Sequence, residues 1–422
     1  MRVLLTGAHG FIGTYVAAAL RAAGHAVVAC VRVPRGSGEV GCDLATDVDP
    51  ADWLPRLGGI GAVVNCAGVL RETDTQTFAA VHAAAPIALF RACVQAGVGK
   101  VVQVSALGEA EDGAFIASKH RADAALATLD LDWTVLRPGL VYSASGCYGG
   151  TALLRALAVL PGAFFLPRGG EQRLRPIAAE DVAAAVVAAL VRPEAARQMI
   201  ELTGPQTMRF VDYLRAWRAW FSLRPALALS VPLPLVEATV AFGETLTRGP
   251  LCRVIWNLLR RERVGAADAA ARLTATLQLV PRSLATALAE RPCRDADRVA
   301  ARLYTLLPAL RIAFALLWIG SGIVGLLTPV ARIAAALPGW PLAFATALAR
   351  GTGLADLALG LLLLCNVRTR LVTALMLAML LAYTAGLGLF AADAWLDPFG
   401  GLIKNFVLLV ALLLLRALAP RA

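Results

Sequence analysis

Apolar runs of two different lengths divide this sequence into two parts. Up to about residue 300 the apolar runs are short and charged residues recur at ordinary intervals, whereas beyond Leu310 the uncharged runs reach about twenty residues. About 20 mostly apolar residues are needed for a helix to cross the hydrocarbon core of a bilayer. The pattern therefore predicts a part that folds in water, followed by a part that lies in a membrane.

The short apolar runs of the first part are rich in β-branched residues, and helix-like segments such as residues 15–23 and 84–96 separate them. The expected strands lie at residues 2–6, 26–31, 62–66, 100–105 and 133–137. Strands that alternate with helices are typical of a parallel sheet with helices on both faces. We therefore expect a doubly wound α/β fold of the Rossmann type, and assign it residues 1–225.

The next region, residues 226–309, has a weaker pattern. Its stretch 227–259 is apolar and contains Pro232 and Pro234, which suits either a substrate lid or a pair of helices that skim the membrane. We assign residues 226–309 to a helical lid or juxtamembrane linker.

The apolar third, residues 310–418, predicts an all-α bundle of four transmembrane helices. The expected spans are residues 312–331, 342–366, 371–392 and 402–415. Arginines stand before the first span, between the second and third, and after the fourth, whereas the loop after the third span carries Asp393 and Asp397. Because basic loops stay on the cytoplasmic side, we expect a multi-pass protein of the inner (cytoplasmic) membrane with both termini in the cytoplasm.

Composition and charge agree with this division. Hydrophobic residues make up 58% of the chain and charged residues 16%, against about 25% charged residues in typical soluble domains. The net charge of +11 comes with arginines clustered just before the apolar third, so a membrane surface explains it better than nucleic acid does. The eight cysteines stand singly, without metal-ligand spacing, so we expect reduced thiols and no metal site.

The strongest local motif is a glycine-rich turn between the first expected strand and a helix. Its candidate cofactor-binding residues are Thr6, Gly7, Gly10, Phe11, Ile12 and Gly13. Glycine permits the tight turn and the close approach of a pyrophosphate, which the N–H groups at the helix N-terminus can bind. The glycines also interrupt an apolar run that could otherwise pass for a secretory signal. We therefore expect a dinucleotide at this turn.

The end of the second expected strand bears on the choice of dinucleotide. An acid there selects NAD, whereas an arginine accommodates the 2′-phosphate of NADP. The chain has Arg32 and Arg35 at this place, which favours NADP(H) over NAD(H). Asp43, followed by Leu44, is a candidate neighbour of the adenine, or else a simple turn residue.

These motifs together resemble the short-chain dehydrogenase/reductase superfamily, in the extended or atypical branch that includes epimerases and dehydratases. Besides the glycine-rich turn, the matching pieces are Asp43-Leu44, Asn65-Cys66-Ala67-Gly68, Ser105, Arg137-Pro138-Gly139, and Arg175-Pro176-Ile177 with Glu180-Asp181-Val182-Ala183. The resemblance covers about the first two hundred residues. It implies that Ala67, Gly68, Lys119 and Pro138 contact the cofactor, and that Ser105 and Lys119 act in catalysis.

The chain departs from that family at its catalytic pair. The family uses a Tyr-x-x-x-Lys pair, in which the lysine lowers the tyrosine pKa and holds the ribose while the tyrosine exchanges a proton. The corresponding segment here runs from Phe115 to Lys119, so the lysine remains but the hydroxyl is absent. Ordinary carbonyl reduction by the family mechanism is therefore in question.

Several side chains could replace the missing hydroxyl. Ser118 is a poor candidate because it lies about 100° from its neighbour Lys119 around the helix. Tyr142 or Tyr148, after the fifth expected strand, could reach the nicotinamide, and His120 is next to the lysine. The remaining possibility is a domain that binds cofactor without turnover. Such a domain resembles the dehydrogenase-like accessory subunit of mitochondrial complex I, which implies a structural role.

The membrane part is similar to the DoxX-like family, a four-helix membrane module. The matching pieces are Arg311, Trp318-Ile319-Gly320-Ser321-Gly322, Asp356 with Gly360, and residues 398–405. An acid within a span costs roughly 2.5 kcal/mol or more, so Asp356 is the polar candidate of the bundle. We expect either a structural ion pair, with Arg350 or Lys404 as partner or Asn405 nearby, or a quinone, proton or substrate role.

Two functions follow as hypotheses. The leading one is a membrane-anchored, NAD(P)(H)-dependent oxidoreductase or epimerase-like enzyme that acts on a lipophilic substrate such as a quinone or isoprenoid. The alternative is a catalytically impaired NADPH-binding scaffold or redox sensor of a membrane complex, which Phe115 favours. A transporter gated by the nucleotide domain is a third hypothesis that depends on Asp356 alone.

Overall fold

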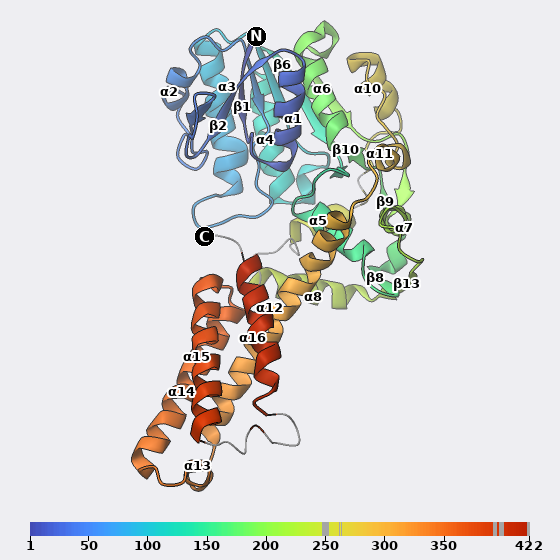
Figure 1. Cartoon of the computed structure of the whole chain (residues 1–422). Helices are drawn as coiled ribbons and strands as arrows, with labels where there is room; N and C mark the ends of the chain where they lie inside the picture. Colours follow the sequence, from blue (N-terminus) through green and yellow to red (C-terminus); the bar gives the residue numbers. More distant parts are fainter. Residues whose placement is uncertain (247–252, 261, 263, 391–394, 396–400, 420–422) are drawn as a thin grey trace. The chain divides into compact units, whose positions relative to one another are not determined.

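A computed structural model describes residues 1–246, 253–260, 262, 264–390, 395 and 401–419 (Figure 1). The chain forms two compact units, one of residues 1–244 and 249–301 and the other of residues 245–248 and 302–422. This division differs from the expected one, because most of the region 226–309 packs within the first unit.

The first unit is built on a sheet of seven strands, all of them parallel. From one edge to the other the strands are β11 (Gln198–Leu202), β6 (Asp132–Pro138), β5 (Lys100–Val104), β4 (Ala62–Asn65), β1 (Arg2–Thr6), β2 (Ala26–Val31) and β3 (Glu39–Gly41). The five expected strands are present to within one residue at each end. The structure adds the two edge strands, β3 and β11.

Alternate residues of the central strands face two layers of helices, which is why these strands are apolar on both sides. Val3 and Leu5 pack against one layer, whereas Leu4 packs against the other. The first layer consists of α1 (Phe11–Ala22), α6 (Ala179–Val191) and α10 (Ala269–Leu277), and the second of α2 (Pro50–Trp53), α3 (Ala85–Gln95) and α4 (Ala114–Ala127). The predicted doubly wound α/β fold is confirmed.

Strand order reverses at β1, which pairs with β2 on one side and with β4 on the other. In open α/β sheets, ligands bind outside the carboxyl ends of the strands at such a reversal. Thr6 ends β1 and Asn65 ends β4, and the two residues lie opposite each other in the register. The fold thus places the glycine-rich turn at the expected ligand edge.

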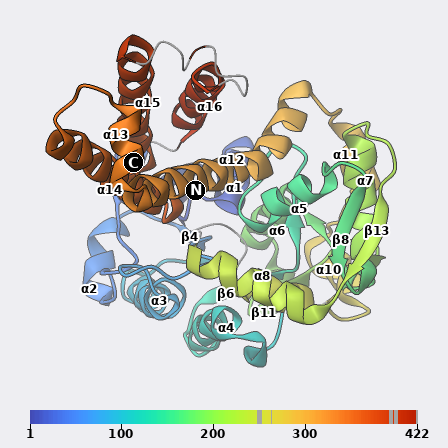
Figure 2. The same cartoon turned by 90° about the horizontal axis from the view of Figure 1, so that it is seen from below.

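The rest of the first unit combines three small sheets with further helices. The strand pairs are β7 (Val141–Tyr142) with β10 (Ile177–Ala178), β9 (Arg173–Leu174) with β12 (Met208–Arg209), and β8 (Ala163–Pro167) with β13 (Leu227–Val231). The helices are α5 (Gly150–Ala158), α7 (Phe210–Trp220), α8 (Leu233–Leu246), α9 (Arg253–Arg260) and α11 (Leu284–Glu290). In both views α5, α7, β8 and β13 lie together (Figures 1 and 2), and they share a core with Phe164 and Trp217.

Five short helical turns complete the first unit. They are η1 (Leu54–Arg56), the π-helical η2 (Ala79–Ala84), η3 (Ala110–Asp112), η4 (Arg168–Gly170) and η5 (Pro193–Ala195). The region expected as a lid or linker contributes to this unit directly, because Leu273 and Leu277 of α10 lie in the core beneath the sheet. Within the stretch 227–259, the described residues form the strand β13 and the helices α8 and α9.

The helix that leads into the membrane part begins within the first unit. This helix is α12 (Asp295–Leu327), and its first turn carries Asp297. The Asp297 carboxylate accepts hydrogen bonds of 3.1 and 3.2 Å from the Arg291 guanidinium, and Arg155 lies 3.6 Å away. These contacts fix the beginning of α12 to the α/β fold of the first unit.

The second unit consists of helices. They are α12 from residue 302 onward, α13 (Val330–Ala336), α14 (Leu342–Leu364), α15 (Thr369–Phe390) and α16 (Lys404–Leu418). Phe314, Trp318, Leu363, Met376 and Leu412 contribute to a core between the long helices, while many other apolar side chains on them are exposed. Such an exposed apolar surface is typical of a bundle that faces lipid.

Glycine allows α12 and α14 to pack closely. A Cβ atom on Gly322 would lie 2.7 Å from the carbonyl oxygen of Gly353, and one on Gly360 would lie 2.7 Å from the Ile319 side chain. Such small residues let the backbones of membrane helices approach each other. Gly320 is different, because a Cβ atom there would meet nothing within 4 Å.

Three of the described helices are long and apolar enough to cross a membrane: α12, α14 and residues 369–389 of α15. They correspond to the first three expected spans, although Ala392, the end of the third, lies outside the described residues. The helix α16 has 15 residues, or about 22 Å of helix. The fourth span therefore stays a prediction.

Candidate functional site

The glycine-rich turn brings three pieces of backbone into direct contact. Gly7 has a φ of +68°, and a Cβ atom there would lie 2.7 Å from the carbonyl carbon of Cys66. A Cβ atom on Gly13 would lie only 2.0 Å from the carbonyl oxygen of Gly7. Only glycine fits both positions, so β1, α1 and the loop after β4 can meet here.

The N-terminus of α1 is available to an anion. Gly10 is the N-cap residue, and among the described residues no side chain caps the first turn, which begins with Phe11 and Ile12. The N–H groups of a first turn have no hydrogen-bond partner within their own helix, and they form the positive end of the helix dipole. The turn therefore fits a pyrophosphate. All six predicted residues from Thr6 to Gly13 belong to this turn or to the strand end and helix start beside it.

A chain of buried polar side chains joins three strand ends behind the turn. The Thr6 hydroxyl donates a hydrogen bond to Asn65 Oδ1, and Asn65 Nδ2 donates one of 2.7 Å to Gln103 Oε1. Asn65 Oδ1 also accepts the N–H of Ala67 at 3.2 Å. This chain holds the loop that contains Ala67 and Gly68. Sequence reasoning missed Gln103, although a polar residue within an apolar strand was a visible signal.

Lys119 on α4 lies below the exposed backbone of Gly68. Its side chain is 6% exposed, and its Nζ donates hydrogen bonds of 3.4 Å to Ala67 O and 3.3 Å to Val104 O. Burial lowers the pKa of Lys119, while the nearby Asp123 carboxylate opposes this shift. Because an ammonium group has three donors, one N–H is left for a ligand next to Gly68.

Phe115 is part of an aromatic cluster and does not face water. Its ring makes edge-to-face contacts with Phe78 and His82, at centroid distances of 5.9 and 5.2 Å, and Phe78 stacks on His82. The His82 Nε2 accepts the N–H of Val69 at 2.9 Å, and its Nδ1 lies 3.0 Å from the Ser118 hydroxyl.

These contacts define the state of His82. Since Nε2 is an acceptor and Ser118 donates its own proton to Phe115 O, the proton of neutral His82 must be on Nδ1. Burial, with the nearby Lys119 charge, lowers the pKa of His82 to about 3. His82 therefore supports the cofactor loop as a neutral ring. Sequence reasoning missed it, because the contact joins residues far apart along the chain.

Ser105 is engaged in a buried charged group. Its hydroxyl donates a 2.8 Å hydrogen bond to Asp123 Oδ2, which also accepts one of 3.0 Å from Arg137 Nε. Arg137 Nη2 forms an ion pair with the same oxygen at 3.0 Å. The Asp123 side chain is fully buried. In this arrangement the Ser105 hydroxyl points toward Asp123, so its main visible role is to join β5 to α4 and β6. Pro138 is buried next to Arg137, and its carbonyl accepts the N–H of Leu107.

The residues expected at the adenosine end lie after β2 and β3. Arg32 and Arg35 are exposed there. Glu39, which sequence reasoning missed, accepts the N–H of Arg35 at 2.6 Å and lies 3.3 Å from His9 of the glycine-rich turn. This region therefore carries positively charged side chains, Arg32 and Arg35, and a negatively charged one, Glu39.

The next segment, with Asp43 and Leu44, is half-buried. Asp43 Oδ1 accepts the N–H of Ala45 at 3.0 Å, so part of this carboxylate stabilises its own turn.

Two of the considered replacements for the missing hydroxyl lie elsewhere. Tyr142 is fully buried among the rings of Tyr213 and Trp217. Burial, with a smaller contribution from the Tyr213 hydroxyl, raises the pKa of Tyr142. Tyr148 is 61% exposed. His120 lies beside the site, with Nε2 3.1 Å from Ala106 O. The interpretation of Tyr142 as a proton donor is wrong, because its ring belongs to the core behind β7.

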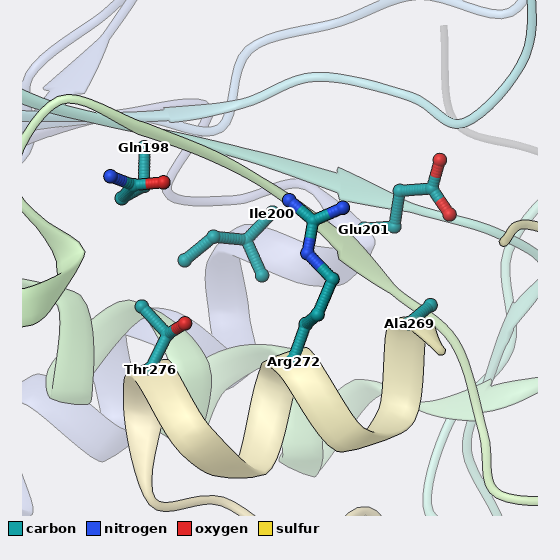
Figure 3. A pocket seen from close by; sticks show the side chains of 6 residues that line it. All are labelled: Gln198, Ile200, Glu201, Ala269, Arg272 and Thr276. Carbon is teal, nitrogen blue, oxygen red and sulfur yellow. The ribbon is translucent and has the colours of Figure 1, made fainter. Parts of the chain in front are cut away.

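Two cavities lie along the β5–β6–β11 side of the first unit. The larger, of about 300 Å³, is lined by Leu107, Gly108, Glu109, Arg137, Glu201, Glu262, Val264, Gly265 and Ala266. It adjoins the Ser105–Asp123–Arg137 group through Arg137. The smaller, of about 60 Å³, lies between β11 and α10, with Arg272 reaching toward Gln198 and Glu201 (Figure 3). The smaller cavity cannot hold more than a few waters.

The second unit has its own buried charged residue, Asp356. It is 4% exposed, and its carboxylate accepts hydrogen bonds from the hydroxyls of Ser321 at 2.9 Å and Tyr383 at 3.3 Å. Arg350 instead donates to the carbonyls of Gly325 and Thr328 at the end of α12. The expected ion pair of Asp356 with Arg350 is therefore wrong.

Comparison with known families agrees with both units. Residues 7–193 match the family described as NAD(P)H-binding, and residues 315–413 match the DoxX-like family. The chain therefore joins a Rossmann-type α/β domain that is similar to NAD(P)H-binding proteins to a helical domain that is similar to the DoxX-like family. Together with three apolar helices of sufficient length, the DoxX-like match supports membrane association.

Curated relatives match the first unit. An epimerase family protein of Mycobacterium bovis is 28% identical over 287 residues, which cover 61% of this chain and 91% of that protein. The photosystem II assembly factor Ycf39 of Synechocystis is 28% identical over 230 residues, which cover 52% of this chain and 64% of that protein.

Solved structures share the fold. A nucleoside-diphosphate-sugar epimerase of Staphylococcus aureus has a TM-score of 0.52 at 16% identity and covers 68% of this chain and 99% of its own. UDP-glucuronic acid 4-epimerase of Bacillus cereus, in complex with UDP-glucuronic acid and NAD, has a TM-score of 0.51 at 17% identity and covers 72% and 99%. At these identities the likeness shows the fold alone.

Proposed function

We propose that this protein is a membrane-anchored NAD(P)H-dependent oxidoreductase that reduces a lipophilic, quinone-like acceptor. The observation that carries the proposal is the combination of a complete cofactor cradle with a phenyl ring, that of Phe115, in place of the family's tyrosine hydroxyl. Bound NAD(P)H supplies a hydride. The question is which acceptor can take it without a tyrosine as proton donor.

The acidity of the product distinguishes the possible acceptors. Reduction of an aliphatic ketone leaves an alkoxide whose conjugate acid is about as weak an acid as water, so a general acid is needed. Reduction of a quinone leaves a phenolate, and phenols such as tyrosine have a pKa of about 10. Water can protonate such a product after the transfer. The absence of a hydroxyl at Phe115 therefore favours a quinone-like acceptor.

The residues of the chain would bind and orient the reactants. Gly7, Gly10 and Gly13 would hold the pyrophosphate at α1, and the third N–H of Lys119 would hold a ribose hydroxyl above Gly68. The 300 Å³ cavity beside Arg137 is large enough for an aromatic head group, since ligand sites begin at about that volume.

The finer parts of the proposal concern the cofactor and the membrane. Arg32 and Arg35 support NADPH over NADH, although Glu39 beside them would favour a free ribose hydroxyl. The basic loops support a nucleotide domain on the cytoplasmic side. A quinone in the membrane would then be close to a cytoplasmic reductant.

The test uses the full chain in lipid nanodiscs with NADPH. We expect oxidation of NADPH with a short-chain ubiquinone analogue, at a rate of about 1 per second or more, and none with an aliphatic ketone. In Phe115→Tyr we expect quinone turnover to continue, because protonation of the product does not limit it. Tight binding of NADPH without turnover on any quinone or isoprenoid would overturn the proposal.

The alternative is a scaffold or redox sensor that binds NAD(P)H and helps to assemble a membrane complex. The packing of Phe115 against Phe78 and His82 favours it, and a relative named as an assembly factor is consistent with it. If NADPH oxidation appears in Phe115→Tyr but not in the natural protein, the scaffold explanation is favoured. Turnover by the natural protein would contradict it.

A further inference from the structure

The two-stranded sheet of β8 and β13 exposes apolar side chains on its outer face. Phe165 is 61% exposed, and Leu227 and Leu229 are 70% and 43% exposed. In the register, Phe165 lies opposite Leu229, and Ala163 lies opposite Leu227. We call these four residues the β8–β13 face.

The other face of the same strands shows that this exposure is not general. Phe164 and Leu166, the neighbours of Phe165, are each 1% exposed and pack in the core with Trp217. Successive residues of a strand point to opposite sides of the sheet. The inner side is therefore an ordinary core. The outer side carries an aromatic ring and two leucines at positions that are normally polar in a strand that faces water.

The charged residues nearest this face along the chain are two arginines, Arg168 and Arg224. Both are exposed, one after β8 and one before β13. The exposed Glu171 and Glu237 follow them, and each forms an ion pair with an arginine, Arg209 and Arg260 respectively. The chain continues from β13 into α8, where Leu235 is 58% exposed. An apolar surface flanked by arginines is complementary to an anionic lipid surface.

The covalent connection keeps the bilayer within reach. The first unit ends at residue 301 and the first expected span begins at residue 312. Both positions lie on the helix α12, so the connection is about 16 Å long. A domain of this size has a radius of gyration of about 19 Å. The domain therefore stays next to the membrane surface, and lipid is the partner that its exposed faces meet first.

We propose that the β8–β13 face inserts into the headgroup region of the membrane, with Phe165, Leu227 and Leu229 toward the acyl boundary and Arg168 and Arg224 toward anionic phosphates. This contact would hold the nucleotide domain in one orientation on the bilayer. It does not depend on the proposed enzymatic activity, because a scaffold would use the same face.

Photo-crosslinking of the full chain in nanodiscs that contain phosphatidylglycerol tests this proposal. A benzophenone amino acid replaces Phe165 in one protein and Val191 in a control, since the two side chains are 61% and 60% exposed. After irradiation, mass spectrometry is expected to find about tenfold more phospholipid adduct at position 165 than at 191. Binding of NADPH, measured in both proteins, verifies that each variant is folded.

Two results would overturn the proposal. One is equal lipid adduct at positions 165 and 191, and the other is an adduct at 165 with a second copy of the chain or with its own helices. The charge contribution has a separate readout: Arg168→Gln with Arg224→Gln should lower the lipid adduct at 165 about fivefold in anionic nanodiscs. No change in this double variant would show that phosphate contacts do not orient the domain.

Discussion

A buried charged residue in each of the two units has only neutral hydrogen-bond partners within the described part of the chain. In the nucleotide-binding unit this is Lys119, bound to the carbonyls of Ala67 and Val104, and in the helical unit it is Asp356, bound to the hydroxyls of Ser321 and Tyr383. Glycine lies near both. The two units differ in what the backbone of these glycines contacts.

In the first unit glycine leaves backbone open to a ligand, whereas in the second it brings two helices together. Gly68 is exposed above Lys119, and Gly7, Gly10 and Gly13 leave the N–H groups of α1 accessible. Gly322 instead faces the backbone of Gly353. A buried charge in the first unit is therefore accessible to a small molecule, while Asp356 is held within a closed helix contact.

The largest effect is expected from Gly13→Val. The added side chain would overlap the carbonyl of Gly7, which a Cβ atom alone approaches to 2.0 Å. We expect a loss of NADPH affinity of at least about 100-fold, equivalent to about 2.7 kcal/mol, measured by calorimetry. Gly58→Val is the matched control, because a Cβ atom there meets nothing within 4 Å. Equal affinities for both variants would contradict the proposed pyrophosphate site.

The corresponding change in the second unit is Gly322→Val. Its side chain would meet the backbone of Gly353, so α12 and α14 must separate. We expect a lower thermal unfolding temperature of the bundle in detergent, with NADPH affinity changed less than about twofold, since additivity holds for distant sites. Gly320→Val should behave as the natural protein does. If both valine variants are equally stable, the close contact of α12 and α14 is not formed.

A smaller effect is expected from pH. Unfolded histidine takes up a proton near pH 6.5, whereas folded His82 does so only near its pKa of about 3. The contribution of neutral His82 to the free energy of unfolding is therefore fully present above pH 6.5. It is lost as the pH falls, by about 2 kcal/mol at pH 5.

Hydrogen exchange of buried amides in β4 and β5 measures this dependence. The variant His82→Gln should show a shallower loss of protection between pH 6.5 and 5, because the other titrating groups remain the same. A His82 ring signal that titrates near pH 6.5 in the natural protein would disagree with the buried, neutral ring.

The smallest effect is expected from Asp356→Asn. An amide oxygen can still accept the hydroxyls of Ser321 and Tyr383, and hydrogen bonds between membrane helices contribute about 0.6 kcal/mol on average. We expect bundle stability to change by less than about 1 kcal/mol, measured by unfolding in mixed detergent micelles. Asp356→Leu, which leaves both hydroxyls without their acceptor, is the comparison and should lose more. A large loss of stability in Asp356→Asn would show that the charge itself is needed.

The fold was predictable to a large extent because its signals are local. The central strands and the glycine-rich turn depend on apolar runs and on spacing, which a short window of sequence contains. The edge strands β3 and β11 are short or pair with β6 from far along the chain, so no local pattern marks them.

The candidate site was predictable only in part because its support is tertiary. Gln103, His82 and Glu39 become neighbours of the cofactor loops through folding. Histidine and glutamate are common on surfaces, and only Gln103, a polar residue within an apolar strand, stood out in the sequence. The error at Arg350 has a geometric cause. Six residues turn a helix through about 600°, which places Arg350 and Asp356 on different sides of α14.

The position of α10 and of Asp297 has a consequence for how the protein is made. The last pieces of the first unit's core, such as Leu273, Leu277 and Leu288, come only a few dozen residues before the first expected membrane span. At about 5–20 residues per second, the ribosome delivers both within seconds of each other. The nucleotide domain must therefore complete its core while the first membrane helix is being inserted. A delay in folding leaves the apolar core of the domain exposed to water, and a delay in insertion leaves the apolar helix exposed.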